Sequence, residues 1–271
     1  MIAFRRSTTV TCSLIAVSLS GALHAQESSK EETPLRQDIT SIPVSRSFNL
    51  IGVGVGLIPE FSGSESYRVL VLPLARASYK DTLYINGIQG GAWLYDSDDK
   101  SVRIGLQLGP RFGWKGKGGT PVAGMEERDF SFEGGPNIQW RTPIGVFNAE
   151  LSWDLGGASN GTTAQLQYIR ALVASPTFRL NGTIGVQWFD GKMNNYYFGV
   201  RPGEVTPTRP SYTARSSSNF QIGVNGSYQV SPRGSLMFGV STSYLGDGAG
   251  ESPIAETRVQ NVIYVGYGIT F

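Results

Sequence analysis

The chain ends in the stretch VQNVIYVGYGITF, residues 259–271, in which apolar side chains alternate with polar or small ones. One face of this stretch, interrupted only by Asn261, carries Val259, Ile263, Val265, Tyr267, Ile269 and Phe271. The other face carries Gln260, Gly266, Gly268 and Thr270, with Val262 and Tyr264 among them. A period of two residues predicts a β-strand with one apolar face.

The same alternation recurs in residues 102–114, 220–230 and 233–245, so these runs are 11–13 residues long. Strands of soluble proteins usually have about 5–6 residues, whereas a tilted strand that crosses a bilayer needs about 9–11. The 35 glycines and the 12 Tyr and 13 Phe residues also suit a membrane barrel, in which every second residue faces a wet interior. The sequence therefore predicts an all-β protein, a closed antiparallel transmembrane β-barrel, and disfavours a soluble sandwich.

Eleven strands can be placed by this period: 47–58, 67–79, 82–95, 101–114, 129–141, 143–156, 163–175, 177–190, 218–230, 233–245 and 259–271. Bacterial single-chain barrels have an even number of strands, so twelve is favoured and ten is the alternative. The missing strand is expected before residue 100, either as segment 36–46 or through a misreading of 67–95. The longer connections 115–128, 191–217 and 246–258 are expected to face outside, and the short turns the periplasm.

The first 25 residues have the features of a secretory signal peptide. Arg5 and Arg6 precede an apolar stretch from about residue 10 to 23, which ends in small residues. Cleavage is expected after Ala25, with Ala22 as the alternative. Residues 26–46 then form a polar periplasmic lead that could include a first strand, and residues 47–271 form the barrel. An exported barrel of this kind is expected in the cell outer membrane, surrounded by lipid.

The mature chain lacks the residues on which most enzyme chemistry rests. Cys12 and His24 are the only cysteine and histidine, and both lie in the predicted signal peptide. Acid–base, nucleophilic and zinc sites lose their usual side chains, so we expect no catalytic site, no metal and no cofactor. Loss of Arg5 and Arg6 reduces 23 basic residues to 21, against 21 acidic ones. This balance argues against nucleic acid as a partner.

Three groups of residues are candidates for function. Polar positions on the inward faces of the strands give a candidate lumen set: Arg103, Arg111, Glu150, Asp154, Arg179 and Gln187. Glu150 and Asp154 could form an acid–base pair, but pairing with lumen arginines is the favoured interpretation. The candidate extracellular loop contacts are Asn194, Asn195, Tyr196 and Tyr197, which could also only pack the loop. The terminal Phe271 resembles the signal that the outer-membrane insertion machinery reads on a final strand.

Several short strings, in order along the chain, resemble one family. They are PEFSGS at 59–64, YRVL at 67–70, LPL at 72–74, YYFGV at 196–200, LGD at 245–247 and ESPI at 251–254, followed by Phe271. Together they resemble the MipA/OmpV family, the MltA-interacting proteins, over residues 48–271. Members often have Tyr where Phe61 stands, and the loop 201–217 is particular to this chain.

The resemblance implies an outer-membrane barrel without known catalysis and without settled catalytic residues. It implies a scaffold role between a lytic transglycosylase and a murein synthase, with docking on the periplasmic turns or on residues 26–46. A narrow channel and an extracellular ligand-binding or adhesin barrel are the alternatives. Aromatic side chains pointing inward from 191–217 would favour a plugged barrel, and a clear lumen would favour a channel.

Overall fold

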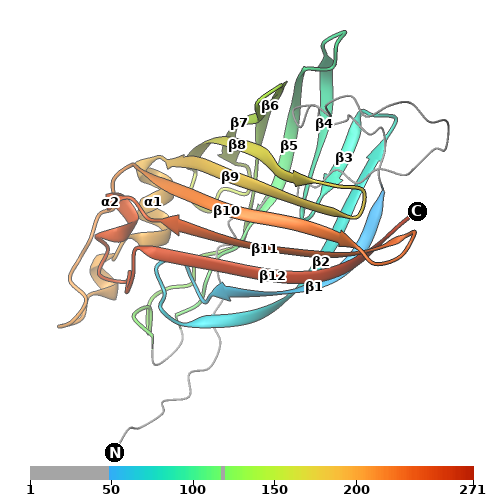
Figure 1. Ribbon diagram of the computed structural model, residues 1–271. Helices are drawn as coiled ribbons and strands as arrows, with labels where there is room; N and C mark the ends of the chain where they lie inside the picture. Colours follow the sequence, from blue (N-terminus) through green and yellow to red (C-terminus); the bar gives the residue numbers. More distant parts are fainter. Residues whose placement is uncertain (1–48, 117–119) are drawn as a thin grey trace, which may run out of the picture.

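The computed structural model describes residues 49–116 and 120–271, and these form a closed antiparallel β-barrel (Figure 1). Twelve strands in the described residues follow one another around the wall in chain order. They are β1 (Leu50–Pro59), β2 (Tyr67–Tyr79), β3 (Leu83–Asn86), β4 (Gln89–Asp96), β5 (Val102–Arg111), β6 (Ser131–Thr142), β7 (Gly145–Asp154), β8 (Thr162–Ala174), β9 (Phe178–Phe189), β10 (Ser217–Gln229), β11 (Gly234–Tyr244) and β12 (Val259–Thr270). The predicted fold class and the favoured strand number are confirmed.

The missing strand comes from the stretch 82–95, which was predicted as one strand and is two. A two-residue hairpin, Gly87-Ile88, separates β3 from β4, and Asn86 pairs with Gln89 across it. Gly87 has a φ of +63°, a left-handed conformation that glycine adopts at little cost. Segment 36–46, the other candidate, lies outside the described residues, as do the predicted signal peptide and the lead 26–46.

The two ends of the barrel differ. At one end, the turn end, short connections join β2 to β3, β4 to β5, β6 to β7, β8 to β9 and β10 to β11, and β1 begins and β12 finishes there. The opposite end, the loop end, carries the long connections with α1 (Gly191–Phe198), the 3-10 turn η1 (Pro202–Glu204) and α2 (Asp247–Gly250). Figure 1 shows both helices gathered at this end. No helix in the described part of the chain is long and apolar enough to cross a membrane.

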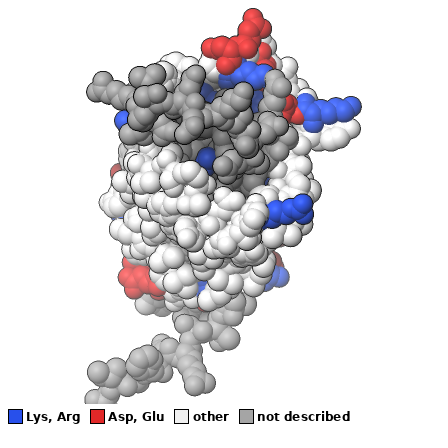
Figure 2. All heavy atoms as spheres, turned by 45° about the vertical axis from the view of Figure 1, so that its right-hand side comes forward, with Lys and Arg blue, Asp and Glu red and all other residues white. Residues whose placement is uncertain are grey.

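The alternation along the strands divides an apolar outside from a more polar inside. Outward side chains such as Ile51 and Val53 are more than half exposed, as suits residues that face lipid. Figure 2 shows that most of the visible wall is uncharged, with acidic residues gathered at the top of the view. Inward positions of β10 and β11 are largely Asn, Gln and Ser, for example Asn225 and Ser241. The predicted period of two is therefore the period of the barrel wall.

Closure of the barrel depends on glycines where the first and last strands meet. Gly52 pairs with Gly268, and Gly54 with Gly266. A Cβ atom on Gly52 would lie 2.2 Å from the carbonyl oxygen of Tyr267 and 2.5 Å from the Cα of Gly268. Both contacts are with backbone, so they cannot relax by rotating a side chain.

We therefore expect Gly52→Ala to destabilise the folded barrel by about 1–3 kcal/mol, since overpacking against a fixed backbone is costly. The loss should appear as a lower midpoint of urea unfolding, followed by heat-modifiable gel migration. Gly90→Ala is the control, because its Cβ would lie 3.4 Å from the nearest atom. Equal midpoints for the two variants would contradict this account of closure.

Candidate functional site

The predicted lumen residues on β5, β7 and β9 do not form one cluster. Arg103 lies towards the turn end, where its Nε donates to Oδ1 of Asp96 at 2.5 Å and its guanidinium lies 4.7 Å from the centre of the Trp93 ring. Arg179 is also near the turn end, and its Nε has no hydrogen-bond partner among the described residues. Arg111 and Gln187 lie in the half nearer the loop end.

Arg111 forms the main ion pair of the interior. Its guanidinium donates to both carboxylate oxygens of Glu133 on the neighbouring strand β6, with an Nη2–Oε2 distance of 2.8 Å. The two side chains are only 14% and 12% exposed. The guanidinium also lies 5.4 Å from the ring centre of Phe189 and 5.9 Å from that of Tyr197. Arg111 therefore connects the polar interior to the aromatic residues above it.

The carboxylates of Glu150 and Asp154 accept hydrogen bonds from different neighbours. Glu150 accepts a hydrogen bond of 2.9 Å from the side chain of Gln107. Asp154 accepts from the backbone N–H groups of Gly156 and Asn160, at 3.0 and 2.8 Å, and so holds the β7–β8 turn. The predicted pairing with lumen arginines is not what the structure shows, since the ion pairs of Arg103 and Arg111 go to Asp96 and Glu133.

A small polar cavity lies beneath the loop end. Its volume of about 50 Å³ leaves room for roughly three to four water molecules. The lining residues are Gln89, Gln107, Gly109, Pro110, Arg111, Glu133, Glu150, Ser152, Thr163, Gln165 and Gln187. Most of these side chains are uncharged hydrogen-bonding groups, so the cavity suits hydroxyl or amide groups.

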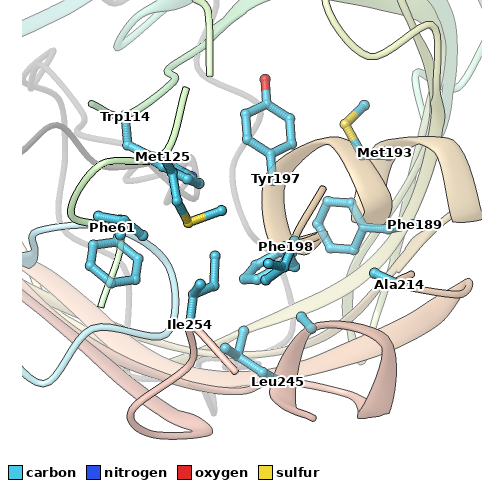
Figure 3. Packing of buried hydrophobic residues seen from close by; sticks show 13 residues of the cluster. Phe61, Trp114, Met125, Phe189, Met193, Tyr197, Phe198, Ala214, Leu245 and Ile254 are labelled. Carbon is cyan, nitrogen blue, oxygen red and sulfur yellow. The ribbon is translucent and has the colours of Figure 1, made fainter. Parts of the chain in front are cut away.

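Above the cavity the long connections pack together into what we call the loop cap, made of residues 60–66, 112–116, 120–130, 190–216 and 245–258. Its apolar core joins all of these segments and consists of Phe61, Trp114, Val122, Met125, Met193, Tyr197, Phe198, Val200, Ala214, Leu245, Ala249 and Ile254, together with Phe189 at the end of β9. Figure 3 shows Phe61, Met125, Phe198 and Ile254, which come from four different segments, lying around one centre. The loop cap therefore has an apolar core of its own, which is continuous with the end of β9 through Phe189.

A buried ion pair fixes two segments of the loop cap to each other. Arg128 is 0% and Glu204 3% exposed, and both guanidinium–carboxylate distances are 2.8 Å. Arg128 also donates to the carbonyl oxygens of Tyr196 and Gly199, at 2.6 and 3.3 Å. Such a pair is stabilising only when its remaining hydrogen-bonding groups are also satisfied, as they are for Arg128.

Arg209 also connects the segments 120–130 and 190–216 of the loop cap. It donates to the carbonyl oxygens of Pro121 and Ala123, at 2.6 and 3.0 Å, and to that of Glu204. Sequence reasoning did not single out Arg128, Glu204 or Arg209. Arg128 and Glu204 are 76 positions apart, and no local pattern in the sequence indicates that two charged loop residues will meet in a buried pair.

The four predicted loop contacts belong to α1 and mostly face the loop cap. Asn194 and Tyr197 are buried, at 1% and 4% exposure, and Asn194 donates to the carbonyl oxygen of Arg215 at 2.8 Å. Asn195 is exposed, but its side-chain oxygen accepts from the backbone of Ala214. Tyr196 packs against the apolar core. These residues therefore hold the helix in place, which was the alternative that the sequence left open.

The pKa of Glu204 reflects this environment. Burial disfavours ionisation of the carboxyl, but hydrogen bonds from the Arg128 guanidinium and from the backbone N–H of Arg201 outweigh it. The pKa of Glu204 therefore lies below its ordinary value of 4.5. Because the folded pKa is depressed, the stabilisation is complete above 4.5 and is lost as pH falls through the folded pKa.

We expect the variant Arg128→Met to open the loop cap, because it leaves the Glu204 carboxylate buried without its partner, at a cost of about 3–5 kcal/mol. Faster proteinase K cleavage within 199–216 would reveal the opening. Arg201→Met is the matched control, since Arg201 and its partner Glu126 are 45% and 69% exposed and such pairs contribute about 0–1 kcal/mol. Equal cleavage rates for the two variants would contradict a structural role for the buried pair.

We also expect acid to loosen the same segment. Hydrogen exchange of backbone amides in 199–209 should rise, after correction for the intrinsic rate, as pH falls from 6 towards the depressed pKa of Glu204. Glu204→Gln should show the raised exchange already at pH 6 and little further change on acidification. An acid response that persists unchanged in this variant would assign it to another group.

The fold and the loop cap define an outer-membrane β-barrel whose long loops pack together at one end, beside a polar interior. A family model described as MltA-interacting protein MipA matches residues 51–271, and the chain belongs to this family of outer-membrane barrels. The MltA-interacting protein of Escherichia coli (strain K12) is 23% identical over 224 residues, which cover 82% of this chain and 89% of that protein. The resemblance found in the sequence is thereby confirmed.

Two Vibrio proteins are similar over a shorter stretch. The outer membrane protein Omp26La of Vibrio anguillarum is 25% identical over 139 residues, 51% of this chain and 54% of that protein. The outer membrane protein OmpV of Vibrio cholerae is 24% identical over 139 residues, with the same coverage. The chain thus aligns with about half the length of these two relatives. Their location agrees with that expected from the sequence, and this chain is an outer-membrane protein.

Solved barrels of similar shape have little sequence in common with the chain. The NanC porin has a TM-score of 0.48 at 11% identity, covering 82% of this chain and 100% of that chain. An outer-membrane channel from Pseudomonas putida F1 has a TM-score of 0.44 at 12% identity, covering 89% and 100%.

Proposed function

We propose that this protein is a non-catalytic interaction protein of the outer membrane, which binds murein-remodelling enzymes on the periplasmic side. The loop cap is the observation that carries the proposal. Its buried core, with Phe61, Trp114 and Phe198, fills the loop end, so solutes have no wide axial path. The name of the Escherichia coli relative, MltA-interacting protein, supports a lytic transglycosylase as the partner.

The turn end is the surface that such a partner would reach, since short turns of outer-membrane barrels face the periplasm. Most of these turns are small, and a specific interface needs about 800 Å² per partner. The β4–β5 hairpin adds surface, because it extends past the neighbouring strands (Figure 1). Its turn is acidic: Asp98 is exposed, and hydrogen bonds from Ser97 and Ser101 lower the pKa of Asp99 to about 2. A basic patch on the partner would complement it.

A pull-down tests this assignment. Immobilised, refolded barrel should retain a purified lytic transglycosylase of the MltA kind. Asp98→Lys should weaken retention several-fold, because reversing a charge at the rim of an interface removes complementarity. Lys192→Glu is the control, since it reverses a similarly exposed charge at the loop end. No retention by the unmodified barrel, or equal loss in both variants, would refute docking at the turn end.

A narrow channel is the second candidate, favoured by the polar cavity around Gln107 and Glu150. Planar-bilayer recording separates the two. The unmodified barrel should show no steady conductance, and Arg128→Met should introduce intermittent openings, because it loosens the loop cap. Steady, discrete conductance of the unmodified protein would instead assign it a channel function.

A further inference from the structure

The barrel wall has a notch on one side, between β2 and β5 in the half nearer the loop end. β2 pairs with β1 at ten positions, from Tyr67 to Arg76, but β3 pairs with β2 at only four, from Arg76 to Tyr79. Figure 1 shows β3 as a short strand between β2 and the tall β4–β5 hairpin. Beyond the hairpin loop Gly87-Ile88, residues 67–74 of β2 have no paired strand on that side among the described residues.

Both edges of the notch carry a proline whose missing N–H falls on the open side. The backbone carbonyl of Ala75 accepts a hydrogen bond from the N–H of Gly87, so it points to the β3 side of β2. Backbone groups two residues apart in a strand point to the same side, so the nitrogen of Pro73, which carries no hydrogen, also points there. In β5 the backbone carbonyl of Val102 accepts a hydrogen bond from the N–H of Ser97, so it points to the β4 side. Every second residue of β5 after Val102 points its backbone groups to that side, and Pro110 is one of them. Within sheets proline is confined to edges of this kind. Both strands that border the notch therefore have a residue that cannot donate a backbone hydrogen bond on the open side.

The notch meets the polar cavity. Gln89 stands at the tip of the β3–β4 hairpin and Gly109 near the end of β5, and both line the cavity. Pro110 lines it as well, although it follows the outward-facing residues Leu106 and Leu108 of β5, which are about half exposed. At this edge the cavity is therefore bordered by residues of both the inward and the outward set of β5.

A backbone edge in the hydrocarbon layer needs hydrogen-bond partners that acyl chains cannot supply. The side chains around it are apolar outside, with Val69 and Val71 at 72% and 63% exposure. Inside, the Arg111–Glu133 pair is neutral as a whole and Glu150 adds a carboxylate, so the lining of the cavity itself offers no unpaired cation. Arg68, an inward residue of the β2 edge whose Nε has no hydrogen-bond partner among the described residues, is not part of that lining. The occupant that fits has an apolar chain and an uncharged, hydroxyl- or amide-bearing head.

We propose that the notch is a lateral binding site for a neutral amphiphile, with its acyl chain in the outer leaflet and its head-group hydroxyls or amides in the cavity. The cavity volume of about 50 Å³ admits a few such groups, and the rest of the head lies in the notch against the edge of β2. The site uses residues of β2, β4 and β5, and it is independent of the turn end and its proposed partner.

The test is photolabelling of the full barrel in phosphatidylcholine nanodiscs with dodecyl maltoside that carries a diazirine in its alkyl chain. Labelled peptides should come from residues 67–75 and 105–111, in excess over the opposite wall around Ile222, which is 61% exposed to lipid. A dodecyl phosphate probe of the same design should label these peptides less. Excess free maltose should leave the labelling unchanged, because the chain holds the probe at the wall.

Gly109→Phe should abolish the excess, because its side chain enters the mouth of the cavity, where a Cβ already lies 2.8 Å from Gln89 Cγ. Gly185→Phe is the matched control: it is also an inward glycine, but it does not line the cavity. Heat-modifiable migration must show that both variants are folded; if Gly109→Phe is not, Gln107→Leu replaces it. Even labelling around the belt, labelling untouched in Gly109→Phe, or cross-links from the β2 edge to a second copy would overturn the proposal.

Discussion

Pairing of backbone polar groups in a medium without water is the constraint on which the structure depends. An N–H or C=O group left open to hydrocarbon costs several kcal/mol, so a membrane-spanning sheet must close on itself. Here closure brings β1 and β12 together, and it is achieved by facing glycines, Gly52 with Gly268 and Gly54 with Gly266. The period of two follows from the same constraint, because each closed strand separates lipid on one side from the interior on the other.

The interior has an apolar part, which lies where β1 and β12 close the barrel, and a polar part on the opposite side. Where the glycine strands meet, Leu50, Leu74 and Met237 fill the space that missing side chains leave and form a small buried apolar cluster. The opposite part, around β5 to β9, carries charged and amide side chains, and its main ion pair joins adjacent strands. Pairing between neighbours satisfies each charge locally, so the polar part does not need the wide aqueous lumen of a general porin.

The sequence predicted the features that depend on a local repeat. It predicted the strands, the twelve-strand class and which residues of each strand point inward, since all follow from the period. It missed the β3–β4 turn, although Gly87-Ile88, with glycine in the first loop position, is a local hairpin signal. It could not predict that Arg111 meets Glu133, or that Arg128 meets Glu204, because side-chain partners depend on register and on loop packing between distant segments.

The loop cap and the notch together decide from which side the interior can be reached. At the loop end, residues from five segments of the chain share one buried core, which is the basis for the proposed absence of a wide axial path. The wall is incomplete only where β3 and β4 are short among the described strands, and the cavity lies against that place. If the proposed lateral site exists, it admits molecules that are already dissolved in the membrane, because the cavity borders the notch. The proposed interface at the turn end and the proposed lateral site at the notch therefore lie on separate surfaces of one barrel.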